Sequence, residues 1–171
     1  MLRLGDFGRD EAGVAAVEVA LVGSLLVTAM FNVVEVGRYS YVATQVTAAS
    51  QAGAQAVLVT CTSAQTPVST NCPSATAAIN NALQGTTLGT GVTQPSALTE
   101  RWYCVNSAGD LQDMAPAASK PTNCAGAGGS GLPGLYVKVE ATYTYQPMFP
   151  GLTVVATLPG AVSRSAWMRV G

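Results

Sequence analysis

The sequence contains no histidine, and only 10% of its 171 residues are charged. Without histidine, neither a Cys-His nor a Ser-His catalytic arrangement can be assembled. There is also no Cys-x-x-Cys pair, which argues against a zinc site. We therefore expect no enzymatic activity, no metal and no cofactor. The scattered carboxylates are expected to be surface residues, although some could pair in principle: Glu100, Asp110, Asp113 and Glu140.

Positive charge is scarce as well. The chain has eight Lys and Arg against nine Asp and Glu. Removal of residues 1–13 would take away Arg3 and Arg9 together with three acidic residues, and would leave a neutral chain. A neutral chain has no electrostatic footprint for nucleic acid. We expect no nucleic-acid partner.

Charge is missing most clearly from one stretch near the N-terminus. No charged residue lies between Val19 and Val34, and Glu18 alone separates this run from the uncharged flank that begins at Val14. A helix over this span would be roughly 30 Å long, which is enough to cross a bilayer core. A secretory signal peptide is the alternative, but its apolar core is usually shorter, and here the helical pattern continues past Arg38. The sequence predicts a transmembrane helix over residues 14–35.

The same helix is expected to extend well beyond the membrane. No proline occurs from Val14 to Thr60. Past the membrane, apolar or small residues recur at spacings of three and four: Val42, Val46, Ala49, Gly53 and Ala56. This stripe is typical of one helix face, and it predicts a continuous helix over residues 14–60, about 70 Å long. The stripe would pack on the chain's own domain, on neighbouring subunits, or on both.

Glu18 is the candidate functional residue of this segment. A carboxylate inside an apolar membrane segment costs on the order of 2.5–3.5 kcal/mol, unless it lies in the headgroup layer. If the chain is cut after Gly13, the new ammonium group of Val14 lies about one helical turn from Glu18, and an adjacent subunit could present the same amine. Pairing would offset the cost only where subunits pack side by side. Gly13 and Val14 are thus a candidate cleavage site, and Glu18 a candidate assembly residue.

Several segments resemble TadE-like pilins of the tight adherence (Tad, or Flp) system. They are the leader Arg9–Gly13, the run Val14–Leu21, the segment Val34–Arg38 and, near the C-terminus, Tyr143–Gly151 and Ala166–Arg169. The resemblance implies a pilin helix packed on a small domain, and cleavage by a dedicated prepilin peptidase. Major Flp pilins typically carry a tyrosine after the glutamate and are far shorter, so the resemblance points to a minor component.

Two classes of function follow. The first is a minor pilin or pseudopilin that is processed by a prepilin peptidase and takes part in assembly of a Tad-type pilus for surface adherence. Its partners would be the peptidase, other Tad pilins and pseudopilins, the inner-membrane assembly platform and membrane lipid. The second is a membrane-anchored extracytoplasmic binding module of a secretion machine that never enters a filament.

Orientation is expected to follow the basic residues that flank the apolar segment. Arg3 and Arg9 precede it and Arg38 follows it. Because nearby Lys and Arg favour the cytoplasmic side, we expect a single pass through the bacterial inner membrane. The N-terminus would be cytoplasmic and the C-terminal domain extracytoplasmic, with the pilus or cell surface as a further location.

The four cysteines all follow the predicted membrane segment. They are Cys61, Cys72, Cys104 and Cys124, an even number in a compartment expected to be oxidising. Three pairings are possible, and Cys61–Cys72 with Cys104–Cys124 is favoured because both close short loops. Each such disulfide would stabilise the domain by roughly 3 kcal/mol in the chain-entropy model. Free buried thiols are the alternative.

We expect three parts in the chain: a leader (residues 1–13), the long helix (14–60) and a small extracytoplasmic α+β domain (61–171). A short helix is expected over Ala75–Leu83, with a Ser74 cap and a Gly85 stop. A hairpin is expected over residues 101–112.

Alternating residues predict a strand over Leu135–Gln146. Two further strands are expected, over Leu152–Leu158 and Ala161–Val170, and would complete an antiparallel meander on which the long helix packs. Strand aromatics could line a ligand groove, although half-buried aromatics are common in sheets: Trp102, Tyr103, Tyr136, Tyr143 and Tyr145.

Overall fold

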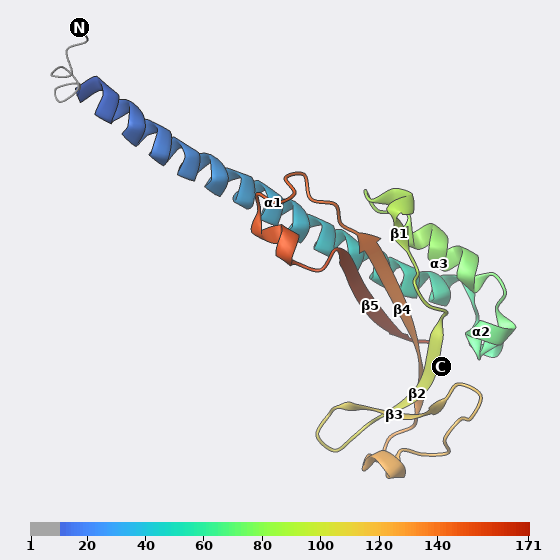
Figure 1. Cartoon of the computed structure of the whole chain (residues 1–171). Helices are drawn as coiled ribbons and strands as arrows, with labels where there is room; N and C mark the ends of the chain where they lie inside the picture. Colours follow the sequence, from blue (N-terminus) through green and yellow to red (C-terminus); the bar gives the residue numbers. More distant parts are fainter. Residues whose placement is uncertain (1–10) are drawn as a thin grey trace, which may run out of the picture. The chain divides into compact units, whose positions relative to one another are not determined.

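The computed structural model describes residues 11–171, so the predicted leader before Glu11 lies outside the described residues. Helix α1 (Glu11–Thr60) is a single α-helix of 50 residues, drawn from blue to cyan in Figure 1. It contains no proline, so every backbone amide can donate to the helix, and its many alanines favour helix formation. The prediction of a long N-terminal helix is confirmed.

The chain divides into two compact units. One unit joins α1 up to Ser40 with the segment Gln146–Pro159, and the other comprises Tyr41–Tyr145 and Gly160–Gly171. The first unit therefore contains the apolar stretch of α1, and the second contains the sheet, the short helices and all four cysteines.

The segment Gln146–Pro159 of the first unit contains a short 3-10 helix, η4 (Val154–Thr157). The prediction of a strand over Leu152–Leu158 is therefore wrong. The amide of Leu158 donates to the carbonyl of Val155 at 3.0 Å, and the Thr157 hydroxyl donates to the Val154 carbonyl at 2.6 Å. Valine and threonine favour strands only where a neighbouring strand offers a pleated surface, and here local hydrogen bonds replace the ladder.

The second unit is built on a five-stranded antiparallel sheet. Its strands are β1 (Val92–Thr93), β2 (Thr99–Val105), β3 (Leu111–Pro116), β4 (Gly134–Thr144) and β5 (Ala161–Arg169). β4 pairs along one edge with β5, and along the other with β2 and β1, while β3 pairs with the far edge of β2. The expected hairpin, formed by β2 and β3, and the expected strands β4 and β5 are confirmed. The strand predicted between β4 and β5, over Leu152–Leu158, is absent, so the predicted three-stranded meander has only two of its strands.

The core of this unit lies between the sheet and the C-terminal part of α1. Alternate residues of β4 are fully buried: Leu135, Val137, Val139 and Ala141. A methyl group added at Gly53 would lie 3.0 Å from Cγ1 of Val139 and 3.2 Å from Cδ2 of Leu83, so the helix backbone approaches these residues closely. The helix-on-sheet α+β fold is confirmed. The predicted stripe holds except at its end, where Val57 is buried and Ala56 is half-buried.

Two short helices follow α1. They are α2 (Val68–Asn71) and α3 (Ala75–Leu83). The bounds of α3 match the prediction, but its serine cap is wrong: Ser74 has helical backbone angles and its side chain makes no capping hydrogen bond. The Ser74 hydroxyl lies 3.6 Å from Sγ of Cys72 instead. Gly85 does lie just past the helix end, where its amide donates to the Ala82 carbonyl.

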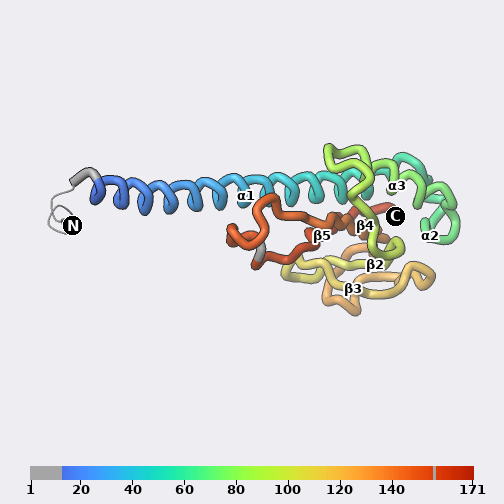
Figure 2. The backbone as a smooth tube through the Cα atoms, turned by 45° about the horizontal axis from the view of Figure 1, so that its top comes forward, coloured from blue at the N-terminus to red at the C-terminus, as the bar shows by residue number. Residues whose placement is uncertain are grey.

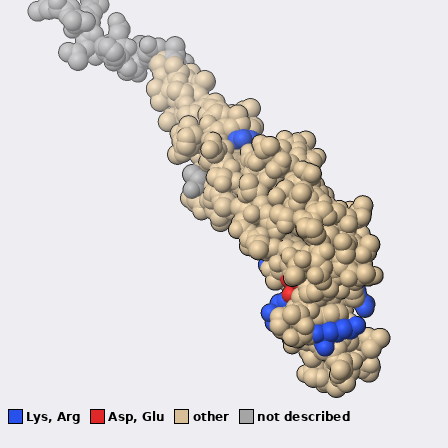
Figure 3. All heavy atoms as spheres, turned by 90° about the vertical axis from the view of Figure 1, so that its right-hand side faces the viewer, with Lys and Arg blue, Asp and Glu red and all other residues tan. Residues whose placement is uncertain are grey.

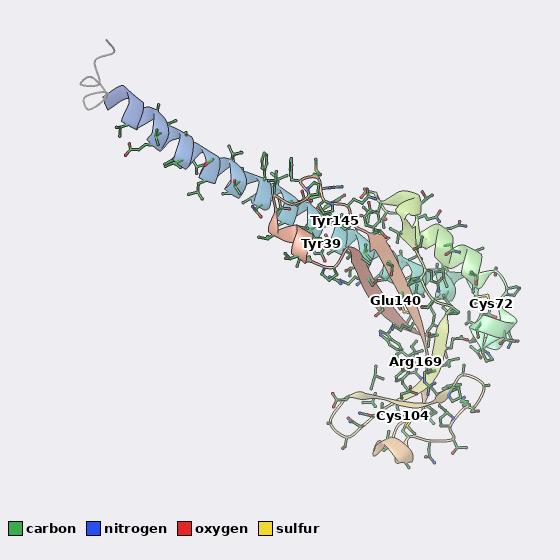
Figure 4. The ribbon with its side chains drawn as sticks, in the orientation of Figure 1. Tyr39, Cys72, Cys104, Glu140, Tyr145 and Arg169 are labelled. Atoms are coloured by element: carbon green, nitrogen blue, oxygen red, sulfur yellow. A yellow bond between two sulfur atoms is a disulfide. The ribbon has the colours of Figure 1, made fainter. Side chains whose placement is uncertain are left out.

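Two disulfides tie these elements together. Cys61–Cys72 joins the end of α1 to the end of α2, with Cα atoms 5.9 Å apart. Cys104–Cys124 joins β2 to the loop after β3, with Cα atoms 5.5 Å apart. Figure 4 labels one cysteine of each pair, Cys72 near α2 and Cys104 near β3. These are the two pairs that the short loops favoured.

Candidate membrane and assembly site

From Gly13 to Met30, the apolar stretch of α1 is exposed on all sides except at the half-buried Gly23. Val19, Leu25 and Val33 are each more than 70% exposed, and no residue from Gly13 to Val34 is buried. On the face shown in Figure 3, the part of the helix that adjoins the grey residues carries no charged side chain. A helix that is apolar all round requires an apolar environment. The helix that contains this stretch is long and apolar enough to cross a membrane, with a mean hydropathy of 2.2 in its most apolar window, and is compatible with a single-pass anchor.

The polar side chains within this stretch bond to the helix itself. The hydroxyl of Ser24 donates to the Leu21 carbonyl at 2.9 Å, and that of Thr28 donates to the Ser24 carbonyl at 2.8 Å. The amide of Asn32 donates to the Thr28 carbonyl at 2.8 Å. Such back-bonding satisfies polar groups where no water is available. Each of these three side chains therefore has a backbone acceptor within the helix when the stretch enters lipid.

The candidate cleavage and assembly residues lie in the first described turns of α1. Gly13, Val14 and Glu18 are all exposed, Val14 to 65%. The spacing of four places Val14 and Glu18 on one helix face. Among residues 11–171, the Glu18 carboxylate has no hydrogen-bond or ion-pair partner. The geometry thus leaves this carboxylate accessible to a group from outside the described chain.

A second acidic residue of the helix, Glu35, has the opposite environment. Its side chain is fully buried, and both of its carboxylate oxygens accept the backbone amide of Met148 at 3.1 Å. The Arg38 guanidinium lies 3.9 Å from the Glu35 carboxylate and donates to the Gln146 carbonyl at 3.0 Å. Glu35 and Arg38 together hold the backbone of residues 146–148 against α1. Figure 2 shows this segment, in orange, beside the helix.

Two further side chains of α1 hold the same segment. The ring of Phe31 stacks on that of Phe149, with centroids 4.5 Å apart. The Asn32 side-chain oxygen accepts the Val154 amide at 2.9 Å. With Glu35 and Arg38, these residues lie within two turns of the helix. The sequence singled out residues 34–38 and 143–151 separately, without assigning Glu35 a role; the structure brings Glu35 and Arg38 together with Gln146 and Met148.

Replacing Glu35 with alanine should release the segment 146–159 from α1. The change leaves the partly buried Met148 amide without its acceptor, at a cost below the roughly 1–3 kcal/mol of a fully buried donor. Hydrogen exchange of that amide in the lipid-embedded protein should accelerate, with Glu35→Gln intermediate because it keeps an acceptor. Val36→Ala, at an exposed neighbouring position, is the matched control and should exchange like the wild type. Equal exchange in Glu35→Ala would show that the carboxylate does not hold the segment.

Glu100 is another carboxylate whose role differs from the expectation. It was expected at the surface, but it is 8% exposed and caps α2. Its two oxygens accept the Val68 amide at 2.7 Å, and the Ser69 amide and hydroxyl at 2.9 and 2.7 Å. A carboxylate at a helix N-terminus satisfies free amides and complements the helix dipole. The interaction spans a long sequence separation, so no local motif indicated it.

The strand aromatics do not line one groove. Tyr103 contacts Tyr136 and Trp167 edge-to-face, at centroid distances of 5.6 and 5.4 Å. Trp102, by contrast, is buried, and its indole donates to the Ala117 carbonyl. Adjacent residues of a strand point to opposite faces, which separates Trp102 from Tyr103.

The same sheet carries an ion pair beside Tyr103. Arg101 on β2 pairs with Asp113 on β3, so Asp113 is a paired carboxylate. Burial raises the pKa of Tyr103, the Asp113 charge raises it further, and Arg101 opposes them. Within residues 11–171 no three His, Cys, Asp or Glu side chains group as metal ligands would.

The comparison with known families concerns the helix. Residues 13–55 match the family model described as TadE-like protein. The similarity is limited to this part of α1 and does not extend to the C-terminal domain. The match includes Gly13, Glu18, Glu35 and Arg38, and it confirms the resemblance that the N-terminal motifs indicated. The C-terminal segments 143–151 and 166–169 lie outside the match. The matched family is a structural, Tad pilus-related family that is not known for enzymes. No curated protein and no solved structure matches the chain.

Proposed function

We propose that this protein is a minor pilin or pseudopilin, cut after Gly13 by a prepilin peptidase, that takes part in assembly of a Tad-type pilus for surface adherence. The observation that carries the proposal is the TadE-like match on a helix whose apolar surface is exposed all round and includes an unpaired Glu18. Such a surface requires lipid before assembly and neighbouring helices after it.

Cleavage after Gly13 would create the group that Glu18 lacks. The new ammonium of Val14 would lie about 6 Å along the axis from Glu18, at about 1.5 Å per residue. In a bundle of such helices, the amine of one subunit pairs with the carboxylate of the next and fixes their axial register. Ala15, Ala16 and Ala20 are small, which allows helices to approach closely.

The proposed location is the bacterial inner membrane, with the N-terminus in the cytoplasm. Arg3 and Arg9 before the apolar stretch support this orientation. The two disulfides support an oxidising compartment for the C-terminal domain. The prepilin peptidase and the inner-membrane assembly platform are the further partners of this proposal.

A membrane-anchored binding module that is never assembled is the second candidate. It is favoured by the aromatic cluster of Tyr103, Tyr136 and Trp167, of which Trp167 is 46% exposed and lies beneath the Lys138 ammonium. Only the first candidate should shorten at its N-terminus on co-expression with a prepilin peptidase.

The Glu18→Ala variant tests the assembly proposal. It should insert and be cut normally, because it removes a desolvation cost, but it leaves the Val14 ammonium without a partner. We expect co-purification of Tad pilins to fall by more than about tenfold, which corresponds to about 1.4 kcal/mol. Val19→Ala, at the exposed neighbouring position, should co-purify partners like the wild type. Wild-type recovery of partners with Glu18→Ala would refute the pairing.

A further inference from the structure

We propose that residues 147–158 form a second membrane-contacting element, an apolar wedge that lies in the outer leaflet beside α1 with lipid acyl chains as its occupant. The inference rests on the proposed membrane placement of α1. It assigns this loop a role that no part of the TadE-like match covers, because the match ends at residue 55.

The wedge has the composition of a lipid-exposed surface. From Ala141 to Ser163 the chain has no charged residue. Four large apolar side chains of the wedge are substantially exposed: Met148 at 57%, Leu152 at 60%, Val154 at 60% and Leu158 at 43%. Removing such a side chain from water is favourable in proportion to the apolar area that becomes buried. A short loop that left all of them in water would forgo much of this stabilisation.

The backbone of the wedge meets the stricter requirement of a membrane environment. Irregular backbone at membrane depth is tolerated only where its polar groups find partners within the protein. Glu35 accepts the Met148 amide, and Asn32 accepts the Val154 amide. The amides of Leu152 and Leu158 donate to carbonyls of the wedge itself. At these four positions, protein oxygens accept the hydrogen bonds that water would accept in an ordinary surface loop.

The wedge continues the apolar surface of the helix. Phe149 stacks on Phe31, and a hollow of about 300 Å³ between wedge and helix is lined by apolar side chains: Val27, Met30, Phe31, Val34 and Phe149. The helix residues of this hollow belong to the stretch predicted to cross the bilayer. Lipid is therefore the medium at this level, and the hollow suits an acyl segment. The wedge also covers Glu35, which explains how a carboxylate at the edge of the apolar stretch is fully buried.

Lipid quenching of a tryptophan placed on the wedge tests the proposal. Full-length Leu152→Trp is reconstituted in phosphatidylcholine vesicles with and without chain-brominated lipid, and the wild type supplies the background of Trp102 and Trp167. Met30→Trp, on the apolar stretch, is the lipid-exposed reference. Leu132→Trp, at a position 81% exposed in the other unit, is the water-exposed reference.

We expect bromine to quench Leu152→Trp by a loss comparable to that of Met30→Trp, with a blue-shifted emission. Quenching no greater than that of Leu132→Trp, while Met30→Trp is quenched, overturns the wedge and leaves the membrane anchor intact. Failure of Met30→Trp to quench overturns the anchor and the wedge together. Protection of Leu152→Trp from both lipid bromine and aqueous acrylamide places a protein on the surface and overturns the lipid assignment.

Discussion

The Gly13→Leu variant, co-expressed with a prepilin peptidase, should remain entirely full-length, whereas the wild type should shorten to an N-terminus at Val14. A peptidase that acts beside the emerging membrane helix needs a small side chain next to the scissile bond. Gly13 also lies within α1 as described, and replacing glycine with leucine stabilises a helix by somewhat under about 1 kcal/mol. In the variant, the larger side chain should hinder recognition of the scissile bond by the peptidase. The more stable helix should also resist the local unwinding that cleavage requires. Intact mass and N-terminal sequencing of membrane fractions measure the outcome.

Gly23→Leu is the matched control for this prediction. A methyl group added at Gly23 would meet no atom within 4 Å, and the position lies in the same apolar stretch. This variant should insert and be cut like the wild type. Normal cleavage of Gly13→Leu would remove Gly13 from the proposed site. A mature N-terminus beyond Val34 in the wild type would favour the signal-peptide alternative.

The elements that the sequence predicted well are those whose signal is local. The strand β4 alternates buried and half-buried residues from Leu135 to Ala141, and this period appears directly in the sequence. The helix α1 has no proline and no competing turn signal. Cys61 and Cys72 lie 11 residues apart, so their pairing needs little more than the turn that follows the helix.

The features that the sequence did not predict depend on distant partners. Glu35 and Met148 are 113 residues apart, and their contact follows from the path of the chain between β4 and β5. Glu100 contacts Val68 across 32 residues for a similar reason. The Leu152–Leu158 segment has strand-forming residues, but Val154 donates its amide to Asn32 and the rest of the segment bonds locally. In each case a tertiary contact outweighs local propensity.

These missed contacts give the TadE-like helix a second role. Its first described turns present Glu18, which lacks a partner among the described residues, whereas Phe31, Asn32, Glu35 and Arg38 hold a segment from the C-terminal part of the chain. One helix thus carries both the proposed assembly residue and the side chains that hold residues 146–154. The two roles can be separated by mutation, because Glu18 and Glu35 lie more than four turns apart at about 3.6 residues per turn.

Removal of the Cys104–Cys124 disulfide, by replacing both residues with serine, should destabilise the sheet unit by roughly 3 kcal/mol in the chain-entropy model. The two cysteines are 20 residues apart and 1% exposed. The loop that they close contains Ala117, whose carbonyl accepts the Trp102 indole at 3.0 Å, and Lys120, whose ammonium lies 5.2 Å from the Trp102 ring. Loosening of this loop should therefore reduce the near-UV circular dichroism of Trp102.

The matched control removes the other disulfide by replacing Cys61 and Cys72 with serine. The Cys61–Cys72 disulfide closes a loop of similar entropic value at the end of α1. That loop contacts β2 at Glu100, whereas the Trp102 indole bonds to the loop that Cys104–Cys124 closes. This variant should lose a similar amount of stability in a urea titration while its near-UV spectrum before unfolding stays close to that of the wild type. Non-reducing mass mapping of native protein should find no free thiol. Four alkylatable thiols would contradict both disulfides and, with them, the extracytoplasmic location that favours their formation.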